Sequence, residues 1–399
     1  MINIKEKEKC CGCSACDNIC PKNCITMHPD NEGFLYPNVN MNECVECSLC
    51  EQVCPILSNE IEKPFSQKAY LIQNKDPKVL SESTSGGAFS ALAEYILKEN
   101  GVVYGAAFNS SFEVVHQGIQ NPDELCKFRN SKYVQSRIEK TFLEAKVHLD
   151  AGRKVLYSGT PCQIEGLKRF LRKDYTNLIT VDVVCHAVPS PLIWEKYKQF
   201  RTSENMNLLE EVAFRDKEYY GYEYSQMTIK LRNGRKLHFG VESDPYLRAF
   251  FSDLSDRPSC YNCQFKKRYR VCDITIWDCF DVFKFSKSLD NNKGVTRALV
   301  HTEKGNKLLQ AISEKCVVVE VDPDFAVKGV RELVKSVQLN PRRKQFFEDA
   351  NRMSNKEFFE FYFPSTLRVK AEYLIRISCI KLGIYQTIKR LAKKVLKRN

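Results

Sequence analysis

Eight cysteines near the start of the chain have the spacing of iron–sulfur cluster ligands. They form two runs of the pattern C-x-x-C-x-x-C-x-x-x-C-P: Cys10, Cys13, Cys16 and Cys20 before Pro21, and Cys44, Cys47, Cys50 and Cys54 before Pro55. In this bacterial ferredoxin spacing, three thiolates of one run bind one 4Fe-4S cluster and the fourth binds the other. The expected ligand sets are therefore Cys10, Cys13, Cys16 and Cys54 for one cluster, and Cys20, Cys44, Cys47 and Cys50 for the second. Zinc or disulfides are the alternatives, but zinc normally takes two C-x-x-C knuckles or Cys/His mixtures rather than triplets.

Cys11 and Cys24 lie outside this pattern, and we expect both to be packing residues. The chain holds 19 cysteines in 399 residues and opens without an apolar leader. Thiols in such number belong in a reducing compartment, so we expect a cytoplasmic protein. The longest apolar stretch near the end, 374–384, is interrupted by Arg376 and Lys381. It falls short of the roughly 20 apolar residues that a membrane span needs.

The net charge of +12 is concentrated at the C-terminal end. From residue 381 onward there are seven basic residues and no acidic one: Lys381, Lys389, Arg390, Lys393, Lys394, Lys397 and Arg398. Apolar residues recur there at helical spacing: Ile377, Ile380, Ile384, Ile388, Leu391 and Val395. Such a helix can lie on the anionic inner face of a membrane, or it can dock on the protein's own core with a solvated basic face. Nucleic acid is a less suitable partner, because no aromatic side chains are interleaved with these charges.

Two further cysteines follow predicted strands in the middle of the chain. The strand at 155–157 ends in a Gly-Thr-Pro turn, and Cys162 opens the next helix; the strand at 178–184 ends directly on Cys185. Open α/β sheets place their sites at these carboxyl ends. With the pair Cys260 and Cys263, the two cysteines could hold a third 4Fe-4S cluster near a helix N-terminus. Zinc on the same four thiols remains an alternative, as does a nucleophilic Cys162 with His186 as its base.

The loop at 81–87 offers hydroxyls and backbone N–H groups at a predicted helix N-terminus, which suits a phosphate. Its candidate contacts are Ser83, Thr84, Ser85, Gly86 and Gly87, and Lys132 with Tyr133 adds a cation and an aromatic ring. Because clusters that carry single electrons commonly exchange them with a flavin, these residues are candidate flavin contacts. A capped helix with a serine-rich entry and an ordinary exposed loop are the alternatives.

These motifs, taken in order, resemble one family. S-T-S-G-G, S-K-Y-V-Q-S, S-G-T-P-C-Q, V-D-V-V-C-H, C-Y-N-C and D-I-T-I behind a paired-cluster ferredoxin resemble the coenzyme F420 hydrogenase/dehydrogenase beta-subunit family, especially its ferredoxin-fused bacterial members, often encoded with polysaccharide-biosynthesis genes. The resemblance covers about residues 1–320. It implies FAD, a 4Fe-4S cluster on Cys162, Cys185, Cys260 and Cys263, and flavin contacts from the S-T-S-G-G loop and Lys132.

The expected fold is α+β or α/β in four parts. Residues 1–58 form a ferredoxin domain with two 4Fe-4S clusters, and 66–150 and 151–322 form the two parts of a mixed α/β domain that resembles the beta subunit and carries the third cluster and the flavin. Residues 323–399 form a helical extension that ends in the basic amphipathic helix.

We therefore expect an iron–sulfur flavoprotein oxidoreductase. Its donor would be a ferredoxin or another low-potential carrier, and its partner another oxidoreductase or a polysaccharide-pathway enzyme, with an envelope-sugar intermediate as a possible two-electron acceptor. One departure favours an alternative: where relatives read G-D-F-W-G, this chain reads Trp277-Asp278-Cys279-Phe280-Asp281, so any conformation that required those glycines is lost. The alternative is a flavin-free electron-transfer subunit that serves a partner enzyme.

Overall fold

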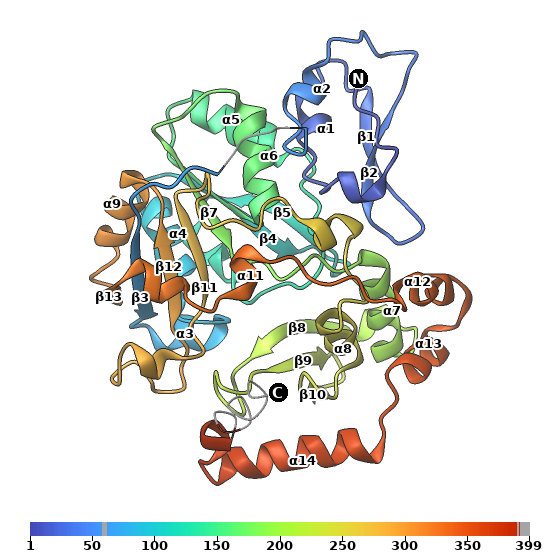
Figure 1. Cartoon of the computed structure of the whole chain (residues 1–399), viewed down its shortest axis with the longest axis vertical. Coiled ribbons are helices and arrows are strands. Elements are labelled where there is room, and N and C mark those ends of the chain that lie inside the picture. The colour runs from blue at the N-terminus through green and yellow to red at the C-terminus, as the bar shows by residue number, and fades with distance from the viewer. Residues whose placement is uncertain (58–61, 389–390, 392–399) are drawn as a thin grey trace.

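The computed structural model describes residues 1–57, 62–388 and 391 (Figure 1). The stretch 58–67, with Pro64, is expected to be a linker, and part of it lies outside these residues. Most of the basic residues at the C-terminal end also lie outside them: Lys389, Arg390, Lys393, Lys394, Lys397 and Arg398.

The two cysteine runs fold in the same way. Each leads into a short helix, α1 (Ala15–Ile19) or α2 (Leu49–Gln52), through a serine with a positive φ, Ser14 at 60° or Ser48 at 59°. Between the runs, strands β1 (Ile25–Pro29) and β2 (Leu35–Val39) pair in antiparallel register. This arrangement is the ferredoxin-like module that the cysteine spacing predicts.

An eight-stranded mixed sheet forms the centre of the molecule, in the order β13-β3-β12-β11-β7-β6-β4-β5. Its strands are β3 (Lys68–Asn74), β4 (Val102–Phe108), β5 (Val114–Ile119), β6 (Val155–Gly159), β7 (Leu178–Val183), β11 (Ile274–Asp278), β12 (Thr296–Val300) and β13 (Cys316–Val321). The four central strands β4, β6, β7 and β11 are parallel to one another, and the outer pairings are antiparallel. The mixed α/β architecture expected from the sequence is therefore confirmed.

Helices cover both faces of this sheet, because residues along each buried strand alternate between two cores. Leu156 of β6 packs with α4 (Ala88–Lys98) and α9 (Glu303–Ala311). Its neighbours Val155 and Tyr157 pack on the other face with α5 (Thr141–Asp150) and α6 (Pro161–Leu171). The ferredoxin-like module contributes Cys11, Cys13, Ala15 and Val53 to that second core.

A smaller three-stranded sheet, in the order β10-β9-β8, lies beside the central one. Its strands are β8 (Leu209–Asp216), β9 (Gln226–Leu231) and β10 (Lys236–Phe239). They pack with α7 (Pro191–Thr202), α8 (Pro245–Phe251), α12 (Arg343–Arg352) and α13 (Asn355–Tyr362) around the buried Trp194. Helix α8 starts at Pro245, and the Asp244 carboxylate caps it by accepting a hydrogen bond from the Leu247 N–H.

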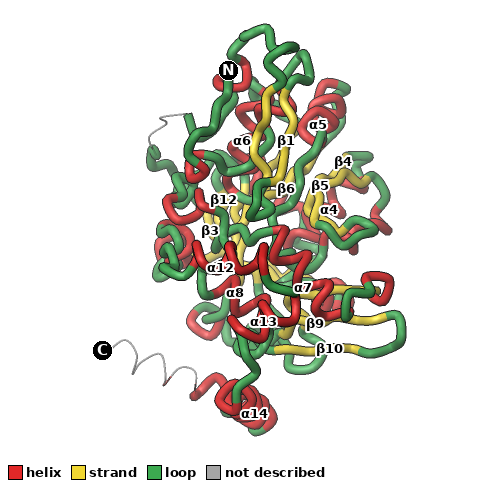
Figure 2. The backbone as a smooth tube through the Cα atoms, turned by 90° about the vertical axis from the view of Figure 1, so that its right-hand side faces the viewer, coloured by secondary structure: helices red, strands yellow, loops and turns green. Residues whose placement is uncertain are grey.

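The remaining short segments are α3 (Pro77–Glu82), α10 (Pro323–Val327), α11 (Arg331–Val334) and the 3₁₀ turns η1 (Lys7–Lys9), η2 (Pro122–Phe128), η3 (Met206–Leu208), η4 (Pro258–Asn262) and η5 (Val282–Lys284). Helix α14 (Leu367–Lys381) has no buried residue and runs along the end of the molecule opposite the ferredoxin-like module (Figures 1 and 2). Among the described residues, none of the helices is both long and apolar enough to span a bilayer.

Candidate functional site

The four cysteines expected to bind the second ferredoxin cluster line one hollow. Cys20, Cys44, Cys47 and Cys50 surround it, together with Cys24 and the chain start at Met1. The Ile2 N–H donates a hydrogen bond to Cys50 Sγ at 3.2 Å, which is the kind of contact that tunes a cluster's potential.

Cys10, Cys13, Cys16 and Cys54 form a second group, which lies deeper. Burial, and after it the charges of Cys10 and Cys54, raises the pKa of Cys16. Burial raises the pKa of Cys54 as well, with the charge of Cys10 adding to the shift. Two cysteines separated by more than 40 residues in sequence therefore lie close in space, as the ferredoxin spacing predicts.

The four cysteines of the larger domain also come together. β6 and β7 are neighbouring parallel strands, so Cys162, at the start of α6, and Cys185, after β7, share one edge of the sheet. Cys260 and Cys263 reach the same place from η4. Burial raises the pKa of Cys185 to about 12. The charge of Lys266 opposes this shift, and the charges of Cys162 and Cys263 add to it.

The same mutual influence acts on the other thiols of this group. Burial, and then the charges of Cys185, Asp256, Cys263 and Cys162, raises the pKa of Cys260. Buried thiols held this close cannot all ionise without a cation among them, and cluster iron would supply it. Positive groups are in reach: Lys266 Nζ donates to the Cys185 and His186 carbonyls, and Arg270 donates to the Val183 carbonyl at 3.0 Å.

Four other cysteines of the larger domain lie outside the three groups: Cys126, Cys272, Cys279 and Cys316. Cys272 Sγ lies 3.4 Å from Thr275 Oγ1, and Cys279 Sγ accepts a hydrogen bond from Arg297 Nε at 3.2 Å. Cys316 is buried with α4 and α9, whereas Cys126 is exposed.

Cys11 joins the ferredoxin-like module to the larger domain. A hydrogen bond with Cys11 is the largest cause of the raised pKa of Cys162, ahead of burial. Helix α6 approaches so closely that a Cβ on Gly166 would lie 2.9 Å from Cys13 Sγ. The sequence predicted Cys11 only as a packing residue, because the spacing of the cluster ligands does not show which part of the larger domain packs against this loop.

Arg257 holds the same interface and was not anticipated. Its side chain is buried, and it donates to the Cys10 carbonyl at 2.8 Å, the Leu35 carbonyl at 2.9 Å and Gln135 Oε1 at 2.9 Å. The guanidinium also lies over the Tyr36 ring, 4.3 Å from its centroid. Each module thus supplies partners to one buried cation.

The β1–β2 turn is bound by the C-terminal extension. Glu32 accepts two hydrogen bonds from Arg343 of α12, at 2.9 and 2.6 Å, and its carbonyl accepts one from Ser190 Oγ. Gly33 has a φ of 83°, and a Cβ there would lie 2.6 Å from the Leu192 nitrogen. The β1–β2 hairpin therefore forms a second contact between the two modules.

The polar groups of the loop proposed for flavin binding form hydrogen bonds with other parts of the protein. Ser83 Oγ donates to the Val79 carbonyl and Ser85 Oγ to the Val295 carbonyl, both at 2.6 Å. The Gly86 N–H donates to Thr296 Oγ1 at 3.0 Å, and Thr84 Oγ1 lies 3.0 Å from Ser131 Oγ. Gly87, with a φ of 72°, starts α4. The three hydroxyls and the Gly86 N–H therefore each have a protein partner, although no side chain caps α4.

Lys132 and Tyr133 are engaged in the same way. Lys132 Nζ donates to the carbonyls of Lys127 and Arg129 at 2.8 Å and of Asn130 at 3.2 Å, and burial lowers its pKa to about 7. Tyr133 OH accepts a hydrogen bond from Arg215 at 3.3 Å.

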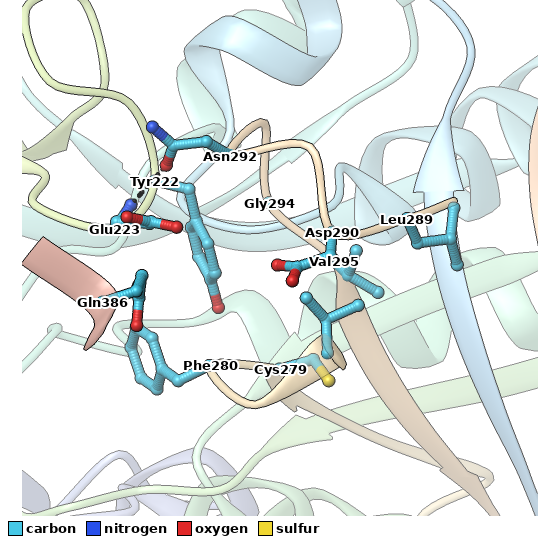
Figure 3. A pocket seen from close by; sticks show the side chains of 11 residues that line it. Tyr222, Glu223, Cys279, Phe280, Leu289, Asp290, Asn292, Gly294, Val295 and Gln386 are labelled. Carbon is cyan, nitrogen blue, oxygen red and sulfur yellow. Dashed lines mark hydrogen bonds between the residues drawn. The ribbon is translucent and has the colours of Figure 1, made fainter. Parts of the chain in front are cut away.

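A hollow lies beside this loop, and the segment that departs from the family pattern fills part of it (Figure 3). Phe280 stacks on Tyr222 with ring centroids 5.3 Å apart, and Tyr222 OH donates to Asp278 at 2.9 Å. Asp281 pairs with Arg297. Among the described residues, the candidate flavin contacts already have protein partners, so they fit a flavin poorly.

His186 contacts Asp253 and Phe250. Its Nε2 lies 2.9 Å from Asp253 Oδ1, and its ring packs edge-on against Phe250. A nucleophilic Cys162 with His186 as its base stays a prediction.

Two family models match parts of this chain. Residues 152–324 match the family model for the C-terminal part of the coenzyme F420 hydrogenase/dehydrogenase beta subunit, and residues 9–56 match that for the 4Fe-4S dicluster domain. A comparison with curated proteins gives no match. A chain in a solved structure of the F420-reducing [NiFe] hydrogenase complex from Methanosarcina barkeri is similar at 15% identity and a TM-score of 0.45, over 77% of this chain and 97% of that one.

The two family models cover the two cysteine-bearing regions described above, one for each module. The chain is therefore an iron–sulfur electron-transfer protein related to the coenzyme F420 hydrogenase/dehydrogenase beta subunit over residues 152–324, with a 4Fe-4S dicluster domain in front.

Proposed function

We propose that this protein is a flavin-free relay of three 4Fe-4S clusters that passes electrons between a low-potential carrier and a partner oxidoreductase. The observation that carries the proposal is the contact of Cys11 and Cys13 with Cys162 and Gly166 of α6. It brings the inner cysteine group of the ferredoxin-like module against the cysteine group of the larger domain.

The order of the relay follows from exposure. Cys47 is exposed and its hollow includes the chain start, so a cluster on Cys20, Cys44, Cys47 and Cys50 would meet an external carrier such as a ferredoxin. Cys13 is buried against α6, so a cluster on Cys10, Cys13, Cys16 and Cys54 would stand between the outer cluster and one on Cys162, Cys185, Cys260 and Cys263. Residues 1–58 would thus act as the input module, and 66–322 as the domain that holds the last cluster.

Each cubane exchanges one electron and breaks no bond, so this chain's residues have to bind, insulate and couple the clusters. Two-electron chemistry would fall to the partner enzyme; an envelope-polysaccharide enzyme is one candidate, on the strength of the family resemblance alone.

A cofactor inventory on protein purified under argon tests the relay. Three cubanes predict about twelve irons per chain, and the flavin-free relay predicts no released flavin. Cys162→Ser should lower iron to about eight per chain, whereas Cys126→Ser, an exposed thiol outside all three groups, should leave it unchanged. About eight irons in the unaltered protein would remove the third cluster, and one flavin per chain would favour the flavoprotein.

We also propose that α14 rests on an anionic membrane surface. Leu367, Leu374, Ile375 and Leu382 are 61–84% exposed along it, and Arg368, Lys370 and Lys381 beside them are not buried. An apolar stripe with basic flanks is typical of interfacial helices.

A further inference from the structure

One cluster of metal-type ligands lies outside the cysteine groups. Nitrogen or oxygen atoms of His186, Asp253 and Asp256 all lie within 4.8 Å of one another. The two nearest, His186 Nε2 and Asp253 Oδ1, are 2.9 Å apart. Two donors about 2.1 Å from one ion and at right angles to each other would be separated by about 3 Å.

Two segments bring these side chains together, since Asp253 and Asp256 both lie between α8 and η4. His186 follows Cys185 after β7, Asp253 follows α8 with a φ of 58°, and Asp256 precedes η4. Asp256 pairs with Pro189 in an isolated antiparallel bridge, and the Ser190 N–H donates to the Ser255 carbonyl at 2.8 Å. The backbone around Asp256 is therefore fixed relative to the segment that carries His186.

Asp256 is the observation that points to a ligand. Its side chain is fully buried, and neither carboxylate oxygen has a hydrogen-bond partner. Burying a carboxylate without a partner is costly whether it is charged or protonated, because a protonated group would still leave its oxygens and its O–H unpaired. Asp253 adds a second carboxylate close by, and burial followed by the Asp253 charge raises the pKa of Asp256.

The nearby cations do not neutralise this carboxylate. Lys266 Nζ donates to three carbonyls, those of Cys185, His186 and Glu332. Arg343 contacts the Asp256 backbone carbonyl at 2.8 Å but directs its charge to Glu32. The charges of Arg343 and Lys266 favour the ionised form of Asp256, but among the described residues no group donates a hydrogen bond to its carboxylate oxygens.

We propose that His186, Asp253 and Asp256 bind one divalent first-row metal ion next to the Cys185 and Cys260 thiols. One imidazole and two carboxylates suit Mn²⁺, Fe²⁺ or Zn²⁺ better than Ca²⁺, which prefers oxygen ligands alone. The side chains of His186 and Asp253 are 27% and 23% exposed, so an ion can enter from solvent and keep open coordination positions. The ion would be separate from the cluster irons, since it takes no thiolate.

Titration of the oxidised, cluster-loaded protein with Mn²⁺ under argon tests this site, with free Mn²⁺ measured by its EPR signal. Mn²⁺ is the suitable probe because it competes poorly for thiolates and will not displace cluster iron. We expect one bound Mn²⁺ per chain in the unaltered protein. Asp256→Asn and His186→Gln should each weaken binding more than about tenfold, while Glu348→Gln, an exposed acid on α12, should not change it.

Iron content and the visible spectrum, measured on the same samples, separate this proposal from the cluster relay. Loss of Mn²⁺ binding at unchanged iron supports a distinct site. If Asp256→Asn also loses iron because its buried site is disturbed, the partly exposed His186→Gln decides. Absence of Mn²⁺ binding to the unaltered protein up to about 1 mM, the weak end of biological cation sites, would overturn the proposal, as would equal binding in all variants.

Discussion

At the scale of single residues, the thiols outside the ligand pattern matter as much as those within it. The sequence predicted Cys24 as a packing residue, and it is buried. Its Sγ nevertheless lies 3.3 Å from Cys20 Sγ, and it lines the same hollow as the four candidate ligands. A thiol in this place can donate a hydrogen bond to a cluster sulfur and stabilise the reduced, more negative cluster.

Cys24→Ala should therefore lower the reduction potential of the outer cluster without removing iron. One hydrogen bond contributes about 1 kcal/mol, which for a one-electron couple corresponds to at most about 40 mV. An EPR-monitored redox titration measures the shift, with Cys126→Ala as the control. If Cys24→Ala instead loses about four irons, Cys24 is a ligand and the assignment of this group has to change.

His116 gives the fold a defined response to acid. It is buried on β5, its Nε2 donates to the Ser158 carbonyl at 2.9 Å, and burial lowers its pKa to about 4. In the unfolded chain its pKa is about 6.5, so between about pH 6.5 and 4 the unfolded state binds a proton that the folded state does not. The stability contributed by neutral His116 is complete above about pH 6.5 and falls as the pH drops toward 4.

Between about pH 7.5 and 5.5 this linkage predicts a loss of about 1.3 kcal/mol in the free energy of unfolding. His116→Gln should be less stable at the higher pH but should lack this part of the pH dependence. Urea unfolding under argon at the two pH values compares the proteins. An identical slope with pH for both would show that His116 ionises normally in the folded state.

At the scale of elements, the interface between the modules depends on one buried guanidinium. Arg257→Met removes three hydrogen bonds and leaves the Cys10 and Leu35 carbonyls unpaired, so we expect a loss of about 3 kcal/mol or more. The midpoint of urea-induced loss of cluster absorbance measures it. Lys140→Met is the comparison: it breaks the Lys140–Asp17 ion pair across the same interface, and because Lys140 is 46% exposed while Asp17 is only 9% exposed, it should cost stability but less than Arg257→Met.

Equal, small effects of the two substitutions would mean that apolar packing and the Glu32–Arg343 contact hold the modules together. The apolar part of the interface is the core shared by Cys11, Ala15 and Val53 with α6.

The sequence predicted the elements better than the contacts between them. Local apolar runs predicted the strands that precede Cys162 and Cys185, and a proline predicted the helix start at Cys162. Such short-range rules were sufficient to place these two cysteines. The partners of Arg257 come from residues more than 100 positions away, which no periodicity reveals. The role of the S-T-S-G-G loop does not follow from its sequence for a related reason: whether a hydroxyl faces a ligand or a neighbouring carbonyl depends on tertiary packing.

At the scale of the whole molecule, the candidate input and the candidate membrane contact lie at opposite ends. The ferredoxin-like module occupies one end of the long axis and α14 the other (Figure 1). A molecule resting on α14 would hold its outer cysteine group away from the surface, where a diffusing carrier can reach it. The basic residues expected beyond α14 would add to the attraction, although they lie outside the described part of the chain.

Substituting two exposed residues of α14 tests this orientation. Leu374→Glu with Ile375→Glu replaces side chains that are 61% and 62% exposed, so the fold should tolerate the change. Charges in the apolar stripe should weaken sedimentation with phosphatidylserine-containing vesicles at least about tenfold, because the helix can no longer bury it among the acyl chains. Val147→Glu, an equally exposed apolar residue on α5, should leave sedimentation unchanged. The attraction should also fall with added salt and be lost on neutral vesicles. Sedimentation that ignores both the paired substitution and the lipid charge would mean that α14 serves another partner.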